Sequence, residues 1–413
     1  MALDWVTTTY LAFMFIALYL FSFFILLAIK NRATLFYAPK ASSPRSVSVI
    51  IPVYNEEKSV AGTVKHVFAS RYPREKMEVI VVNDGSTDST ERVVRGLLRK
   101  YSLLRLITQP NGGKARAINR GIAAAKGELI AVVDSDSFPE PASLGKLVGY
   151  FEDKQMAAVT SFVRVRNRSV NMLARIQSLE YLILGWSRKL LDYVDSVYVT
   201  NGPLSVYRKK AVLRVGGFDP RSITEDIDIT WNLMYHGYKT GMCLDARVST
   251  LAPERFRAWF LQRTRWGMGG LQAIAKYKSM FFRRGMFGAF VLPFVSLSII
   301  ISIFTFLFSV YLIAKFFMVR ALTVSYSLST DSAVFTLQEL NYYPSVIVYF
   351  FVVMLTLSMT YSWYILKTTR YEEQLTTKKL FNLLFYILVY LTLYPLVWFA
   401  SIWRYLRRDM RWR

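Results

Sequence analysis

Asp134 and Asp136 stand one residue apart at the end of a strongly apolar run, in a chain of 413 residues with a formal net charge of +24. Two carboxylates on such a turn can hold Mg²⁺ or Mn²⁺, which often bridge carboxylate and phosphate oxygens. Taken alone, the pair could equally be two solvated acids. The chain has only two histidines, His66 and His236, and one cysteine, Cys243, so a bound metal would be held by oxygen.

A second acidic group lies in the segment ITEDIDIT, where Glu225, Asp226 and Asp228 fall within four positions. Thr224 could cap a helix that starts here, and acids in a first helical turn interact favourably with the helix dipole. That explanation needs no function. An active site would be the other explanation for this cluster.

Three further stretches carry groups suited to a nucleotide. VVNDGSTDST places Asp84 at a strand end, where a carboxylate can bond a nucleoside, although Asp-Gly is also a common turn. QPNGGKARAINRG sets a Gly-Gly turn before Lys114, which suits a diphosphate or a plain helix start. QRTRW carries Arg265, whose guanidinium can pair with a diphosphate, and Trp266, whose ring can stack on a sugar. The same stretch could instead be an ordinary interfacial helix.

The segments that would position these groups alternate between strands and helices. SVSVIIPVYNEE, EVIVVNDGS and ELIAVVDSD are apolar runs that end in polar turns, and LRLITQPNGG is a weaker version. Helical segments such as KSVAGTVKHVFAS and SLGKLVGYFE lie between them. This alternation predicts a mostly parallel sheet, whose ligands gather beyond the carboxyl ends of the strands. The polar turns all fall at those ends.

Four uncharged runs each exceed the roughly 20 apolar residues that a bilayer core requires, and they span 5–29, 286–314, 344–366 and 380–403. The first predicts an anchor and not a removable signal peptide, because it is too long and lacks a basic leader and a small-residue cleavage site. Lys30 and Arg32 follow it, so the positive-inside rule places residues 30–285 in the cytoplasm. Three later spans would send the basic tail outside, against that rule. Either one of those runs lies along or re-enters the membrane, or the rule fails here.

Two stretches, 169–192 and 254–284, combine basic side chains with aromatic or aliphatic ones at helical spacing. Such helices can lie in the lipid headgroup layer or pack on the core of a domain. The second stretch directly precedes a predicted span, which favours the membrane interface for it.

The motifs of this chain and their order closely resemble those of the membrane-integrated glycosyltransferases of family 2. These motifs are VSVIIPVYNEE, VVNDGSTDS, GGKARAIN, DSD, VTNGPLSVYRKK, GGFD, TED and QRTRW, in that order. That family includes hyaluronan, cellulose and poly-N-acetylglucosamine synthases and enzymes that elongate glycolipids. The resemblance covers about residues 46–285. It implies an α/β cytoplasmic domain of the A-type glycosyltransferase fold, with a mostly parallel Rossmann-like sheet, plus an α-helical transmembrane region. The expected divisions are a transmembrane helix (1–30), the glycosyltransferase domain (31–253), amphipathic interfacial helices (254–285), a membrane region with about three helices (286–403) and a basic tail (404–413).

The resemblance also implies roles, residue by residue. Asp226, the last residue of Thr-Glu-Asp, would be the general base, and Asp136 would be the direct metal ligand, beside Asp134. The donor would be bound by Pro52, Tyr54, Glu56, Asp84, Lys114, Asp134, Ser135, Asp136, Gln262, Arg265 and Trp266. The acceptor would be bound by Asn201, Gly202, Glu225 and Trp266, although Asn-Gly-Pro is not the commonest form of the family's acceptor segment.

The implied activity is an inverting, metal-dependent hexosyl transfer, with Mg²⁺ or Mn²⁺, from a nucleotide sugar to a hydroxyl of a lipid-linked or glycolipid acceptor at the cell membrane. GDP-mannose is slightly favoured over UDP-sugars, from a resemblance to archaeal-type glycolipid mannosyltransferases. A processive polysaccharide synthase is the alternative, although it usually has more helices. A transporter with a nucleotide-binding domain is an alternative of another class, but the four runs hold no ionisable residue for a translocation path. Nothing resembles a nucleic-acid-binding motif.

Overall fold

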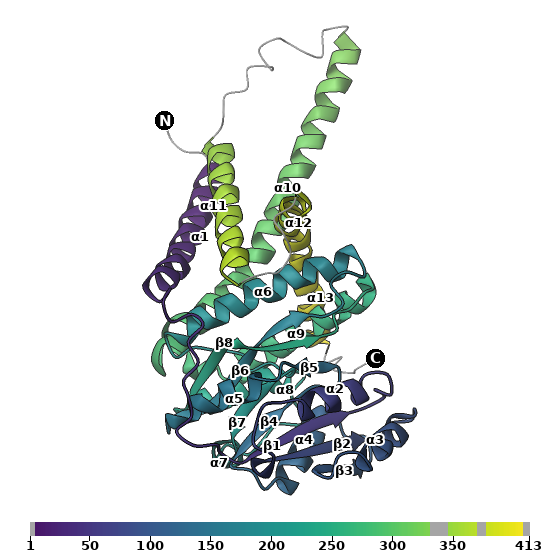
Figure 1. The fold of residues 1–413 in the computed structure, drawn as a ribbon. Helices are drawn as coiled ribbons and strands as arrows, with labels where there is room; N and C mark the ends of the chain where they lie inside the picture. Colours follow the sequence, from purple (N-terminus) through teal and green to yellow (C-terminus); the bar gives the residue numbers. More distant parts are fainter. Residues whose placement is uncertain (1–4, 331–345, 370–376, 408–413) are drawn as a thin grey trace. The chain divides into compact units, whose positions relative to one another are not determined.

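The computed structural model describes residues 5–330, 346–369 and 377–407 (Figure 1). The chain divides into two compact units. One consists of residues 1–26 and 295–399, and the other consists of residues 27–294 and 400–413.

The first unit is built from long apolar helices. It contains α11 (Val346–Thr368), α12 (Thr377–Phe385), the π-helix η6 (Tyr386–Tyr390) and the short 3₁₀ helix η7 (Leu391–Leu393). It also contains the larger part of α1 (Trp5–Lys30) and of α10 (Leu292–Thr330) and the first part of α13 (Tyr394–Leu406), whose remaining residues belong to the second unit. Four helical stretches in the described part are long and apolar enough to cross a membrane, namely Thr7–Lys30, Phe287–Thr330, Val348–Thr368 and Leu380–Leu406. They coincide with the four uncharged runs of the sequence. Six of the ten residues of the basic tail, 408–413, lie outside the described residues.

Aromatic side chains hold the helices of the first unit together. The rings of Phe21 on α1 and Tyr361 on α11 have centroids 5.2 Å apart, and Phe13 on α1 lies 5.2 Å from Phe304 on α10. These helices are mostly apolar, so packing between side chains contributes to their association.

The second unit surrounds an eight-stranded sheet (Figure 1). Its strands are β1 (Val47–Val53), β2 (Met77–Asp84), β3 (Leu104–Gln109), β4 (Leu129–Val132), β5 (Ser137–Pro139), β6 (Met156–Val165), β7 (Ser205–Arg208) and β8 (Lys239–Thr250). Its helices are α2 (Val60–Phe68), α3 (Thr90–Leu98), α4 (Lys114–Ala124), α5 (Ser143–Val148), α6 (Met172–Asp192), α7 (Lys209–Arg214), α8 (Glu225–Tyr235) and α9 (Phe256–Lys276). Four short helices complete it: η1 (Arg74–Lys76), η2 (Gly149–Glu152), η3 (Lys278–Met280) and η4 (Phe287–Val291).

The strand order is β3-β2-β1-β4-β7-β6-β8-β5. Strands β3, β2, β1 and β4 are parallel, and β6 and β8 form a second parallel pair. Strand β7 is antiparallel to both β4 and β6, and β5 is antiparallel to β8. The predicted mostly parallel α/β sheet is therefore confirmed, with two antiparallel strands that the sequence did not indicate.

Helices cover both faces of this sheet. Side chains alternate along each strand, so Val49 and Ile51 of β1 join the core under α2, α3 and α5, while Ile50 joins the core under α4, α7 and α8. Every residue of β1 is buried, which explains why the strand reads as a continuous apolar run.

Helix α6 belongs to the core of this unit. Trp186 is fully buried, and the ammonium of Lys189 is buried against Asp192 at 2.6 Å and the carbonyl of Met242 at 3.1 Å. Residues 172–192 therefore pack on the core of the domain, which was one of the two alternatives that the amphipathic pattern left open. Lys189, one of the basic side chains of that stretch, can be buried because Asp192 on the same helix neutralises it.

Candidate active site

The Asp134-Ser135-Asp136 turn follows β4 at the carboxyl end of the parallel strands. The N–H of Asp134 donates to the carbonyl of Gly202 at 3.1 Å, which fixes the turn against the segment before β7. Burial, together with the charges of Asp134 and Glu56, raises the pKa of Asp136 to about 6. Within the described ranges no cluster of three or more His, Cys, Asp or Glu forms a ready-made metal cage. Two neighbouring carboxylates are nevertheless a donor set that Mg²⁺ and Mn²⁺ accept.

Lys114 joins the two acidic groups that the sequence places far apart. It is the first residue of α4, and its Nζ lies 2.6 Å from Oδ1 of Asp134 and 2.7 Å from Oε1 of Glu225. Burial alone would lower the pKa of this ammonium, but Asp134 and Glu225 together raise it above its usual value. The turn after β4 and the start of α8 are therefore parts of one site.

Gly202 lies directly against this ion pair. A Cβ at this position would lie 2.7 Å from Nζ of Lys114 and would overlap the carboxylate of Asp134. A real Cβ does not come that close, so a larger residue at 202 would displace the side chains of Lys114 and Asp134.

Asp226 lies in the first turn of α8, half-buried, next to Glu225. Burial and the charge of Glu225 raise the pKa of Asp226 to about 6, while Lys114 and Arg265 oppose the shift. A carboxylate with this pKa can accept and release a proton near neutral pH. Thr224 occupies the N-cap position as expected, but its side chain makes no capping hydrogen bond and packs instead on α9.

Helix α9 carries Gln262, Arg265 and Trp266. Arg265 lies close enough to α8 to lower the pKa values of both Glu225 and Asp226. The intervening Arg263 turns inward, where its guanidinium pairs with Glu180 of α6 and lies 4.1 Å from the centroid of the Trp266 ring. The helix thus presents Arg265 toward the acidic site, while Arg263 supports the neighbouring Trp266.

Asp84 is buried at the end of β2, and only 4% of its surface is exposed. Its Oδ1 accepts hydrogen bonds from Gln109 Nε2 at 2.7 Å and Gly112 N at 3.0 Å, and its Oδ2 accepts one from Gly113 N at 2.8 Å. The carboxylate thus organises the Gly-Gly turn that leads into Lys114. The nucleoside contact expected for Asp84 stays a prediction.

Residues that end β1 lie at the same edge of the sheet. Pro52 pairs with Val82 inside the strand, Tyr54 is 48% exposed just beyond it, and burial raises the pKa of Glu56. The charge of Asp134 also raises the pKa of Glu56, so the segments after β1 and β4 face a shared space.

Asn201 is buried beside Gly202. Its Oδ1 accepts a hydrogen bond from Nη1 of Arg188 on α6 at 2.8 Å. Its Nδ2 is buried without a hydrogen-bond partner among the residues that the structure describes. A buried hydrogen-bond donor without an acceptor destabilises the folded state unless another group, such as a ligand hydroxyl, accepts its hydrogen bond.

Sequence reasoning overlooked the side chains that support the site from α6, namely Glu180 and Arg188. A signal for Glu180 was available, because it is an isolated acid within the apolar helical stretch SLEYLILGW. Acids in such a position are rarely fully buried unless they are paired. No local signal distinguishes Arg188, whose partner Asn201 lies in another segment.

Comparisons with known proteins show which family the chain resembles. Residues 44–269 match the family model described as "Glycosyltransferase like family 2". The chain is 31% identical over 246 residues to a probable glycosyltransferase, YdaM, of Bacillus subtilis, a match that covers 57% of this chain and 58% of that one. It is also 31% identical over 232 residues to the poly-beta-1,6-N-acetyl-D-glucosamine synthase of Staphylococcus aureus, with 56% of each chain covered. The chain therefore matches less than two thirds of the length of these relatives.

Among solved structures, the fold is similar to that of the mannosyltransferase PcManGT from Pyrobaculum calidifontis, which was determined in complex with GDP-Man and Mn²⁺. The TM-score is 0.54 and the identity is 24%, over 66% of this chain and 75% of the other. This likeness supports the A-type glycosyltransferase fold. Because the family model covers more than half of its residues, the chain belongs to glycosyltransferase family 2.

Proposed function

We propose that the protein is an inverting, metal-dependent hexosyltransferase that moves a sugar from a nucleotide sugar to a hydroxyl of a lipid-linked or glycolipid acceptor, forming a β-glycosidic bond. The observation that carries this proposal is the position of Lys114. It joins Asp134, of the carboxylate pair suited to a metal-bound diphosphate, to Glu225, whose neighbour Asp226 is suited to deprotonate an acceptor.

In the proposed reaction, Asp226 takes the proton of the acceptor hydroxyl as its oxygen attacks the anomeric carbon. The attack comes from the face opposite the leaving group, so an α-linked donor gives a β-linked product. Arg265 pairs with the departing diphosphate and stabilises the charge that develops there. Asp136, with Asp134, would hold Mg²⁺ or Mn²⁺, which when bound neutralises charge on the same phosphates.

The donor occupies the edge of the sheet formed by the ends of β1, β2 and β4. Pro52, Tyr54, Glu56 and Asp84 line its nucleoside end, and Lys114, Ser135 and Gln262 surround the diphosphate. Asn201, Gly202, Glu225 and Trp266 border the acceptor. The unpartnered Nδ2 of Asn201 supports this assignment, because a sugar hydroxyl could accept its hydrogen bond.

GDP-mannose is the favoured donor, and the solved mannosyltransferase with GDP-Man and Mn²⁺ supports that choice. A processive polysaccharide synthase is the second candidate, and the relative that makes poly-beta-1,6-N-acetyl-D-glucosamine supports it. A lipid acceptor is preferred, because the described residues provide only three apolar stretches after the catalytic unit.

We further propose that the protein is a multi-pass cell-membrane protein with its catalytic unit in the cytoplasm. Four apolar stretches in the described residues support the membrane position, and Lys30 and Arg32 after the first of them support the orientation. In this arrangement residues 254–285 lie along the membrane surface, next to a lipid acceptor.

The test is a donor screen with purified protein in phosphatidylglycerol vesicles that contain a monoglucosyl dioleoylglycerol as acceptor. GDP-mannose, UDP-glucose and UDP-N-acetylglucosamine are each supplied with Mg²⁺ or Mn²⁺, and the lipid products are analysed by mass spectrometry and NMR. The addition of one or a few β-linked hexoses is expected. A long polymer formed from donor alone would establish the synthase alternative, and α-linked products would contradict an inverting mechanism.

Asp226→Asn should abolish transfer while leaving donor binding nearly unchanged, because the residue acts on the acceptor. Asp245→Asn is the matched control, since that carboxylate pairs with Lys146 on α5 and belongs to no part of the proposed site. Normal turnover by the Asp226→Asn variant would rule out the assigned base.

A further inference from the structure

We infer that the carboxyl-terminal half of α9 is a positioning clamp for Asp226. The clamp consists of Gly269, Gln272 and Lys276, and it holds the start of α8 at a fixed place relative to Arg265 and Trp266 on the same helix. The inference rests on the proposed function, in which Asp226 is the base and Arg265 binds the diphosphate.

The first contact of the clamp is a close approach between two helices. Thr224, 2% exposed, packs directly on Gly269, and a Cβ at position 269 would lie 2.5 Å from Cγ2 and 2.7 Å from Cβ of Thr224. Real Cβ atoms do not come that close, so any larger residue at 269 would push α8 away from α9. Thr224 is two residues before Asp226, and Gly269 is one helical turn after Arg265.

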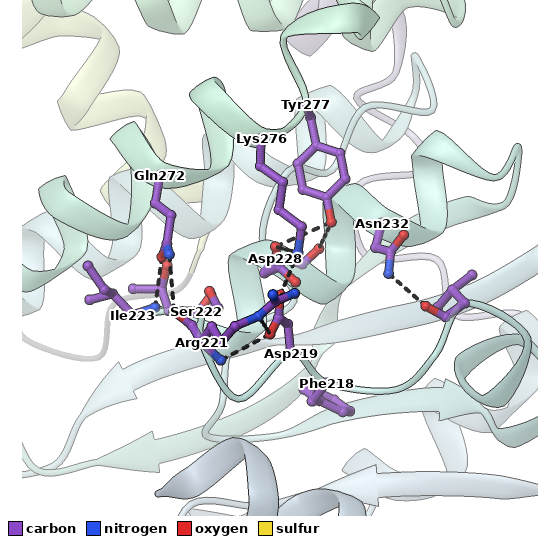
Figure 2. A network of polar contacts seen from close by, with 12 residues as sticks. Phe218, Asp219, Arg221, Ser222, Ile223, Asp228, Asn232, Gln272, Lys276 and Tyr277 are labelled. Carbon is purple, nitrogen blue, oxygen red and sulfur yellow. Dashed lines mark hydrogen bonds and ion pairs between the residues drawn. The ribbon is translucent and has the colours of Figure 1, made fainter. Parts of the chain in front are cut away.

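The second contact is made by the amide of Gln272, as Figure 2 shows. Its Oε1 accepts a hydrogen bond from the N–H of Ile223 at 2.9 Å, and its Nε2 donates to the carbonyl of Arg221 at 3.0 Å. One side chain thereby holds both backbone groups that flank Ser222. This fixes the path of the chain into α8.

The third contact lies after Asp226 in the sequence. Nζ of Lys276 lies 2.7 Å from Oδ1 of Asp228 and 3.0 Å from Oδ2 of Asp219 (Figure 2). The hydroxyl of Tyr277 donates to Asp228 at 3.2 Å. Asp228 is only 3% exposed, so the carboxylate of this ion pair is buried in the protein.

These contacts hold the chain on both sides of the proposed base, at residues 221–224 before it and at Asp228 after it. The clamp residues lie at spacings of three and four along α9, so they share one face of the helix. That helix also carries Arg265, so a rigid element links the group that would bind the leaving diphosphate to the group that would deprotonate the acceptor. A misplacement of about 1 Å can reduce a rate about a hundredfold.

Gln272→Met tests the clamp, because it keeps the side-chain length and removes both hydrogen bonds. Hydrogen exchange of the purified protein, followed by mass spectrometry, should show at least tenfold faster exchange in residues 222–229 with no change in residues 129–136. Exchange that stays unchanged in 222–229 would overturn the inference. Gly269→Ala is a second variant that should have the same local effect.

Turnover provides a readout that a merely structural role would not change. With GDP-mannose, Mn²⁺ and monoglucosyl dioleoylglycerol vesicles, Gln272→Met should lower kcat at least tenfold while the affinity for GDP and Mn²⁺ stays within twofold. A fall in the affinity for GDP and Mn²⁺ as large as the fall in kcat would contradict positioning through Asp226.

Val148→Ala is the control for a general loss of stability, because Val148 is a buried residue of α5 outside the site. It should lower the unfolding temperature without changing exchange in 222–229. The two proposals fail separately. Full turnover by the Asp226→Asn variant would refute Asp226 as the base. If Asp226→Asn is inactive but Gln272→Met has normal exchange and turnover, only the clamp is refuted.

Discussion

The ion pair between Glu180 on α6 and Arg263 on α9 allows a quantitative test of how the site is supported. Only 3% of the Glu180 side chain and 1% of the Arg263 side chain are exposed. Arg263 Nε also donates to Oε1 of Glu180 at 3.2 Å, and its guanidinium lies against Trp266. Glu180→Gln keeps the shape of the side chain and removes its charge, so the buried guanidinium loses its counter-charge.

Removing one partner of a buried ion pair costs about 3–5 kcal/mol, because the other charge stays buried and uncompensated. An exposed pair contributes only about 0–1 kcal/mol. In a unit of about 250 residues, each kcal/mol shifts the unfolding temperature by about 2–4 °C. Glu180→Gln is therefore expected to lower the unfolding temperature by about 6–20 °C.

The assay is thermal unfolding of the detergent-solubilised protein, followed by tryptophan fluorescence. Glu91→Gln is the matched control, because Glu91 pairs with Arg95 at 2.6 Å but the two side chains are 34% and 64% exposed. It should shift the unfolding temperature by only a few degrees. Glu180→Gln combined with Arg263→Met should recover most of the loss, since an apolar replacement of a whole buried pair is often neutral. A Glu180→Gln variant as stable as the Glu91→Gln control would refute the reasoning.

Two further predictions concern the chemistry of the site. The pKa of Asp226 is raised to about 6, and the base must be ionised to act. The value of kcat should therefore fall tenfold per pH unit below about pH 6 and level off above it. A rate independent of pH between 4.5 and 7 would contradict this assignment. Gly202→Ala should lower turnover at least tenfold, because the added methyl overlaps the Lys114–Asp134 pair, whereas Gly145→Ala, whose Cβ would meet nothing within 4 Å, should leave turnover unchanged. Steady-state kinetics with the same donor and vesicles measures both.

Sequence alone predicted the parallel part of the sheet well. Strands β1, β2 and β4 are central and covered on both faces, so they read as apolar runs that end in polar turns. Strand β7 was not foreseen because its direction follows from pairing with β4 and β6, and not from local propensity. The same holds for the three-residue β5, which is too short to form a pattern.

The site was predicted as a set of separate motifs, and the contacts between them could not be. Lys114, Asp134 and Glu225 were each identified, but nothing local indicates that one ammonium lies between the two carboxylates. The burial of Arg263 was not predicted, because its partner Glu180 lies 83 residues away in the sequence. Asp84 was expected to face a ligand, and its hydrogen bonds to the following Gly-Gly turn depend on a β2–β3 register that no motif encodes.

The concentration of acids in this basic protein has a physical explanation in the balance of charges at the site. Among the described residues, the carboxylates of Asp134, Asp136, Glu225 and Asp226, with Glu56 close to Asp134, outnumber the cations Lys114 and Arg265. An excess of negative charge is left over. Burial is the larger cause of the raised pKa values of Asp136 and Asp226, and the neighbouring carboxylates add to it. A divalent cation at Asp136 would balance the remaining charge, and its positive charge is also what a nucleoside diphosphate needs to enter an acidic site. Metal and donor are therefore expected to bind together more tightly than either alone.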